Sequence, residues 1–129
     1  MNDEKLKEIA NKILKAANLQ NEEKFGSVVV ILMVISIILT CVRVIQECNK
    51  SKSVFSDSSS KATFYGDQIK SLSGARGWFT KMRLKKIIRR ELSPEDYKIY
   101  GQRLMDAILN YGENINQEDV CTLVEAANV

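Results

Sequence analysis

The part of the chain with the most pronounced chemical character is a basic run between positions 76 and 90. It holds seven Lys or Arg residues and no Asp or Glu, although the net charge of the 129-residue chain is only +3. Cations at this density attract phosphates, whether these belong to lipid headgroups or to nucleic acid. As a helix, the run places its cations opposite an aliphatic side. The residues predicted to contact an anionic surface are Trp78, Phe79, Lys81, Arg83, Lys85, Lys86, Arg89 and Arg90.

The bilayer is the first partner that this run suggests, because aromatic rings beside cations suit the headgroup region of a membrane. A protein partner or a second copy of the chain is an alternative, and so is a solvated face with no binding role. Nucleic acid is disfavoured. If the last two predicted helices formed a helix-turn-helix, the second would present Glu118 and Asp119 to the phosphates.

Catalytic chemistry finds no support in the residue types. The chain has no His, so it lacks the usual general base near neutral pH and the commonest metal ligand. The Glu95-Asp96 pair is explained by capping of a helix start. The three cysteines, Cys41, Cys48 and Cys121, show no CxxC spacing. We therefore expect a non-enzymatic protein with no catalytic, cofactor-binding or metal-binding residues.

A long apolar stretch lies upstream of the basic run. Residues 25–42 are eighteen positions without a charge, which as a helix extend ~27 Å, close to the ~30 Å hydrocarbon core of a bilayer. Arg43 follows near the end, where its long side chain can reach the headgroups. The pattern predicts a transmembrane helix over residues 25–45. The alternative is a helix buried inside a soluble bundle or between subunits.

The remaining segments complete an all-α prediction. Residues 1–24 form an amphipathic helix and a hinge, and residues 46–75 form a Ser-rich linker. Residues 76–129 form a basic three-helix domain, in which Ser93-Pro94 and Asn116 start helices and Gly112 ends one. The C-terminal side is the more basic and carries both cysteines outside the span. It is therefore expected on the cytoplasmic side of a single-pass protein.

Two stretches carry a resemblance to a known group. They are residues 25–50, with the exit Val42-Arg-Val-Ile-Gln-Glu-Cys-Asn-Lys50, and residues 76–101, which run from Arg76-Gly-Trp-Phe to Tyr97-Lys-Ile-Tyr-Gly101. They resemble small hypothetical membrane proteins encoded by tailed bacteriophages of marine bacteria. The resemblance implies a viral gene product acting in a bacterial cell or virion, at the host membrane, and transfers no functional residues.

The function predicted from these features is that of a single-span membrane protein. It would present its basic helical domain at the membrane surface to anionic lipid or to a protein partner. One alternative is a soluble, oligomeric virion or assembly component with residues 28–45 buried between subunits. A further alternative is a holin-like protein that permeabilises the membrane.

Overall fold

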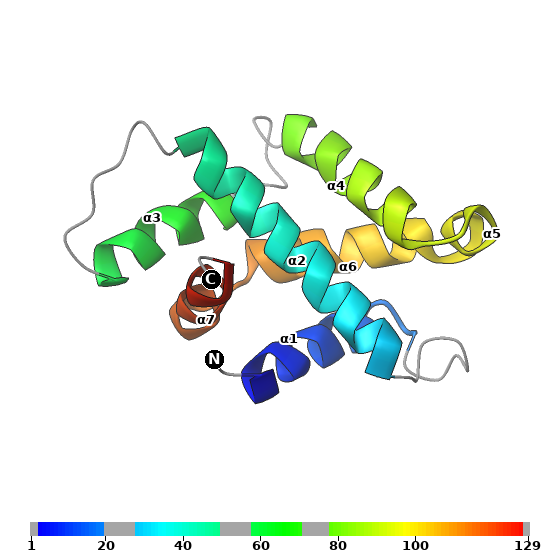
Figure 1. Ribbon diagram of the computed structural model, residues 1–129, viewed down its shortest axis with the longest axis horizontal. Helices are drawn as coiled ribbons and strands as arrows, with labels where there is room; N and C mark the ends of the chain where they lie inside the picture. Colours follow the sequence, from blue (N-terminus) through cyan, green and yellow to red (C-terminus); the bar gives the residue numbers. More distant parts are fainter. Residues whose placement is uncertain (1–2, 20–27, 50–57, 71–77, 128–129) are drawn as a thin grey trace.

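The computed structural model describes residues 3–19, 28–49, 58–70 and 78–127, and within these ranges the chain is helical and contains no strand. This confirms the all-α prediction. The elements shown in Figure 1 are α1 (Asp3–Ala16), α2 (Val28–Asn49), α3 (Ser58–Lys70), α4 (Trp78–Glu91), α5 (Pro94–Asp96), the π-helix η4 (Tyr97–Gly101), α6 (Gln102–Glu113) and α7 (Gln117–Ala127).

Helix α1 has the amphipathic character that its sequence predicts. Asp3 and Glu4 lie in its first turn, where acids complement the helix dipole. Its buried side faces the bundle. The chain then turns at Asn18, whose φ of 58° is one that Asn tolerates better than most residues. Arg103 of α6 holds this turn, with its Nε donating to the Ala17 carbonyl at 3.2 Å and its Nη2 to the Asn18 carbonyl at 2.7 Å.

Helix α2 crosses the molecule and contacts α1, α3, α4 and α7 (Figure 1). Val34, Ile37 and Val42 are among its buried side chains. Among the residues that the structure describes, no helix combines the length and apolarity that a membrane crossing requires. The transmembrane helix predicted over residues 25–45 therefore finds no support here.

The serine-rich segment also differs from its prediction. The sequence predicts a linker over residues 46–75, but Ser58–Lys70 forms α3 in the structure. Tyr65 and Ile69 of α3 are buried, and α3 packs against both α7 and α2. A Cβ added at Gly66 would lie 3.4 Å from Val120 Cγ2, an ordinary van der Waals distance, so α3 and α7 are in close contact here. Helix α3 thus covers part of α2, although the composition of this segment indicates a linker.

Arg43 also has a different environment from the one expected. Its Nε donates to the carbonyl oxygen of Ala127, at 3.4 Å, at the C-terminal end of α7. A cation at this end of a helix complements the partial negative charge of the helix dipole. Arg43, the one charge within residues 25–45, therefore joins α2 to α7.

The C-terminal helices begin where the sequence predicts, but α6 runs through Gly112, the predicted stop, to Glu113. The backbone N–H of Asp96 donates to Ser93 Oγ at 3.1 Å, with Pro94 at the first helical position, and Asn116 Oδ1 accepts from the N–H of Asp119 at 2.7 Å. Between α5 and α6, however, the helix widens into the π-turn η4. Buried side chains form one continuous cluster from Leu6 to Ala127, so these helices share their core with α1, α2 and α3.

Candidate functional site

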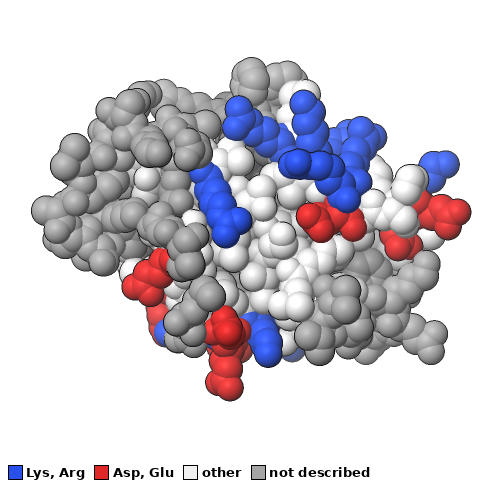
Figure 2. Space-filling model, in the orientation of Figure 1, with Lys and Arg blue, Asp and Glu red and all other residues white. Residues whose placement is uncertain are grey.

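Helix α4 presents its basic residues on one side, as its sequence predicts. Leu84, Ile87 and Ile88 are buried against the bundle. Positions 82, 83, 85, 86, 89 and 90 fall within an arc of about 160° at 100° per residue. We call this arc the basic face; its residues, all exposed, are Met82, Arg83, Lys85, Lys86, Arg89 and Arg90. Figure 2 shows blue side chains gathered over α4, at the upper right of the view.

The predicted contact residues fall into three groups. Arg83, Lys85, Lys86, Arg89 and Arg90 lie together on the basic face. Lys81 is half-buried, and both Lys81 and Arg83 make further interactions within the protein. Trp78 and Phe79 belong to α4, but their side chains lie outside the described part of the chain. Apart from Lys81, the predicted cations therefore lie on one exposed side of α4.

Three charges of the basic face, those of Lys85, Lys86 and Arg90, are not neutralised by ion pairs within the described residues. The two ion pairs that the structure describes join α1 to α7, and Lys85, Lys86 and Arg90 take part in none. Like charges on adjacent turns of a helix repel one another. Three neighbouring cations without an internal ion pair, Lys85, Lys86 and Arg90, are suited to an external anion.

Sequence reasoning missed a second feature beside the basic face. The guanidinium of Arg89 lies over the ring of Tyr97, with its Cζ 4.9 Å from the ring centroid. Next to them is a hollow of about 530 Å³ lined by Arg89, Pro94, Tyr97, Lys98 and Gln102. The ring of Tyr97 is half-buried. Its contact with Arg89 depends on how the chain reverses between α4 and η4.

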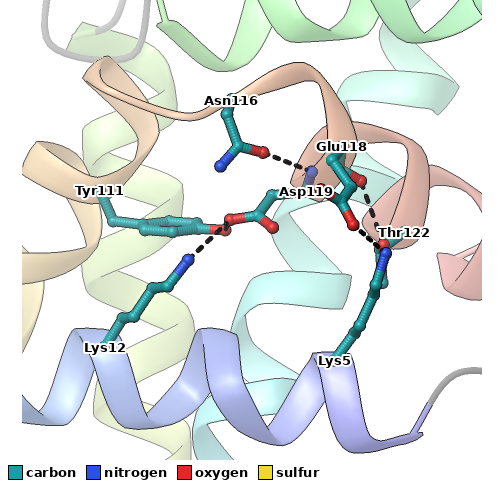
Figure 3. A network of polar contacts seen from close by, with 7 residues as sticks. All are labelled: Lys5, Lys12, Tyr111, Asn116, Glu118, Asp119 and Thr122. Carbon is teal, nitrogen blue, oxygen red and sulfur yellow. Dashed lines mark hydrogen bonds and ion pairs between the residues drawn. The ribbon is translucent and has the colours of Figure 1, made fainter.

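A second cluster of polar side chains joins α1 to α7 (Figure 3). The hydroxyl of Tyr111 donates to Asp119 Oδ2 at 2.8 Å, and Lys12 Nζ lies 3.5 Å from the same oxygen. Lys5 pairs with Glu118; this hydrogen bond lowers the pKa of Glu118 and raises the pKa of Lys5. The Asp119 carboxylate is nearly enclosed by these partners. The cluster therefore links α1, α6 and α7 through polar contacts.

The same cluster offers no group suited to acid–base catalysis near neutral pH. Burial, and then the hydrogen bond to Asp119, raise the pKa of Tyr111 well above its ordinary value of 10.0. A hollow of about 260 Å³ opens beside it, lined in part by Lys12, Asn110 and Asn114. Asn114 Nδ2 already donates to the Asn110 carbonyl at 2.9 Å. This hydrogen bond between the two asparagines thus stabilises the C-terminal end of α6.

A pH titration of stability tests this view of Tyr111. Because the folded-state pKa of Tyr111 lies above 10.0, the folded protein holds this proton more tightly than the unfolded chain. The contribution of Tyr111 is fully present below pH 10.0 and declines as the pH rises further. Tyr111→Phe should flatten the alkaline fall in the free energy of unfolding, measured by urea denaturation between about pH 8 and 11. Tyr100→Phe, which removes a hydroxyl from a half-buried tyrosine outside this cluster, is the matched control variant.

Metal and thiol chemistry have little support among the described residues. No group of three or more His, Cys, Asp or Glu in this part of the chain is placed to hold a metal ion. Cys41 is buried in α2, and burial raises the pKa of its thiol to about 12, so it is a poor nucleophile. Cys121 is half-buried, and the side chain of Cys48 lies outside the described residues.

Comparison with known proteins adds no candidate. No protein-family model, curated protein or solved structure matches the chain. The argument for function therefore rests on the two polar regions described above. Of these, the α1–α7 cluster is occupied by its own internal bonds, whereas the basic face of α4 is directed outward.

Proposed function

We propose that this chain is a non-enzymatic binding protein that attaches to an anionic lipid surface through the basic face of α4. The observation that carries the proposal is the exposure of five cations on one side of a helix whose other side is buried in the core. Met82 lies among them and is 43% exposed. A flexible apolar side chain surrounded by cations suits the boundary between headgroups and acyl chains.

The strength of such a contact comes mainly from charge. Near an anionic leaflet each Lys or Arg contributes about 1 kcal/mol, so the basic face supplies a useful but salt-sensitive attachment. The aliphatic side of α4 is not available to enter the bilayer, because Leu84 and Ile88 are almost fully buried. The helix would therefore lie on the headgroups while the bundle remains folded.

A stronger form of the proposal makes residues 25–45 a single-pass anchor with the C-terminal helices on the cytoplasmic side. That arrangement requires α1, α3, α4 and α7 to leave the sides of α2 that they now cover. Peripheral attachment requires no such rearrangement, and we favour it. Alkaline or high-salt washing of membranes separates the two, because it releases a peripheral protein and leaves a spanning one. If the viral resemblance holds, the membrane would be that of a bacterial host.

Removing charge from the basic face tests the proposal. The triple variant Lys85→Gln, Lys86→Gln, Arg90→Gln should bind vesicles of phosphatidylglycerol and phosphatidylcholine about 30- to 150-fold more weakly, from the loss of about 2–3 kcal/mol. Vesicle sedimentation at about 0.1 M salt measures this. These side chains are exposed, so far-UV circular dichroism should be unchanged.

A charge-matched control excludes a general effect of net charge. Lys7, Lys15 and Lys70 are exposed cations on α1 and α3, and changing all three to Gln removes the same charge. This variant should lose far less affinity. Equal loss in both triple variants, or no binding by the wild-type protein, would reject the basic face as the lipid contact. Binding to a nucleic acid duplex with no binding to vesicles would assign the same face to nucleic acid.

The outward side of α2 favours a second candidate, an assembly component that binds copies of itself. Leu32 is 53% exposed, and Ile35 and Leu39, one and two turns further along the same side, are only half-buried. This is the predicted alternative in which residues 28–45 lie between subunits. An oligomer of defined size in detergent-free buffer would support this candidate.

A further inference from the structure

The hollow next to the basic face has the composition of a binding site for one anionic group. Its lining residues include Arg89, Lys98, Tyr97 and Gln102, and the amide Nε2 of Gln102 donates to Asp106 Oδ1 at 2.9 Å. Arg89 belongs to α4, whereas Tyr97 and Lys98 belong to η4. Two cations therefore approach the same space from separate elements, as a compact anion requires.

Arg89 is held in place by its aromatic neighbour. The guanidinium lies over the Tyr97 ring, with its Cζ 4.9 Å from the ring centroid, and this cation–π contact holds it beside the hollow. A side chain already fixed in this way loses less conformational entropy when it binds. Its forked N–H donors match two oxygens of a phosphate.

Tyr97 is fixed in turn by the π-turn. A Cβ added at Gly101 would lie 2.7 Å from Tyr97 Cδ2, so the ring packs directly on the glycine backbone and a larger residue would displace it. Such single π-turns occur frequently at functional sites. Here the wider turn places Tyr97 against Arg89 and keeps Lys98 exposed beside it.

From this geometry we infer that the hollow binds a phosphomonoester group. A phosphomonoester carries up to two negative charges, which the pair of cations complements, and oxygens that a guanidinium can bind in pairs. The hollow of about 530 Å³ is larger than a phosphate and leaves room for the molecule that bears it. This inference rests on the proposed function for its lipid form, in which the group is a phosphomonoester headgroup such as that of phosphatidic acid. The same chemistry also fits a soluble phosphate.

Vesicles matched in surface charge test the lipid form. The wild-type protein should bind phosphatidic acid vesicles about fivefold more tightly than phosphatidylglycerol vesicles adjusted to the same zeta potential. The variant Arg89→Gln, Lys98→Gln should bring this ratio close to one. Lys86→Gln, Arg90→Gln removes two charges of the basic face outside the hollow, so it should weaken binding to both vesicles and leave the ratio unchanged.

Inorganic phosphate distinguishes the two sources and separates this inference from the proposed function. Added without vesicles, phosphate should shift the ¹⁵N–¹H signal of Arg89 Nε in wild type and leave the other guanidinium signals of α4 little changed. A shift together with a vesicle ratio of one, or with no vesicle binding, would assign the hollow to a soluble phosphate compound. A ratio of one with no shift would overturn the inference, even if the basic face still binds anionic vesicles.

Discussion

Replacing Ile37 by Ala is expected to lower the free energy of unfolding by about 2–5 kcal/mol. Ile37 lies in the middle of α2 and is 0% exposed, so the substitution removes buried methyl groups and leaves a cavity between packed helices. The measurement is urea denaturation in detergent-free buffer, followed by far-UV circular dichroism. The expected loss is a large part of the stability of a small domain.

Leu32→Ala provides a control on the same helix. Leu32 is 53% exposed, so its truncation should change the free energy of unfolding by less than about 1 kcal/mol. The contrast between the two variants tests whether protein surrounds α2. If lipid surrounded α2, both side chains would contact acyl chains. Both substitutions would then change the free energy of unfolding by similar amounts. Equal losses, or the absence of cooperative unfolding without detergent, would contradict the bundle.

Local signals predicted the helix starts of this fold, because each depends on a few neighbouring residues. Ser93 with Pro94, and Asn116 with the acids that follow it, cap helices in the structure as their sequence indicates. The alternation of cations and aliphatic residues in α4 likewise predicted which side is buried. These features required no knowledge of distant contacts.

The environment of α2 could not be predicted in this way. A helix that is apolar on all sides is consistent with either a protein core or a bilayer, because both remove it from water. One of the helices that pack against α2 is α3, whose Ser58-Ser59-Ser60 start indicates a linker. Its helix is stabilised by burying Tyr65 and Ile69 against distant parts of the chain, which local propensity does not record.

The hollow next to α4 was missed for a similar reason. Tyr97 and Tyr100 both lie on a stripe that predicts core packing, and both are half-buried. The contact between Arg89 and Tyr97 requires the reversal after Leu92 and the wider π-turn that begins at Tyr97. A π-turn contains one more residue than a turn of α-helix. A helical wheel drawn with 3.6 residues per turn therefore does not account for it. Basic composition therefore predicted the face but not the hollow.

Replacing Asp119 by Ala is the second substitution with a large expected effect, about 2–4 kcal/mol in the free energy of unfolding. The change removes a charged acceptor from the Tyr111 hydroxyl and leaves this half-buried donor without its partner. It also removes the ion pair with Lys12, which links α1 to α7. The cap of α7 should survive, because Asn116 accepts from the backbone N–H of residue 119.

Glu118→Ala is the matched control for the Asp119 variant. The Glu118 side chain is 69% exposed, so solvent screens its pair with Lys5, and its loss should have a far smaller effect than that of Asp119. The two acids are adjacent in the first turn of α7, and removing either changes the charge near that helix end equally. Equal destabilisation would therefore point to the helix dipole instead of the Tyr111–Asp119 contact.

A double-mutant cycle of Asp119→Ala with Tyr111→Phe isolates that contact. If the 2.8 Å hydrogen bond joins α6 to α7 as the structure shows, each single variant removes it and the double variant loses it only once. The coupling between the two sites should then be about 1–2 kcal/mol. Additive effects would mean that the two groups act independently. In that case apolar packing would hold α1, α6 and α7 together. The free energy lost in the Asp119 variant would then come from the loss of its ion pair with Lys12 alone.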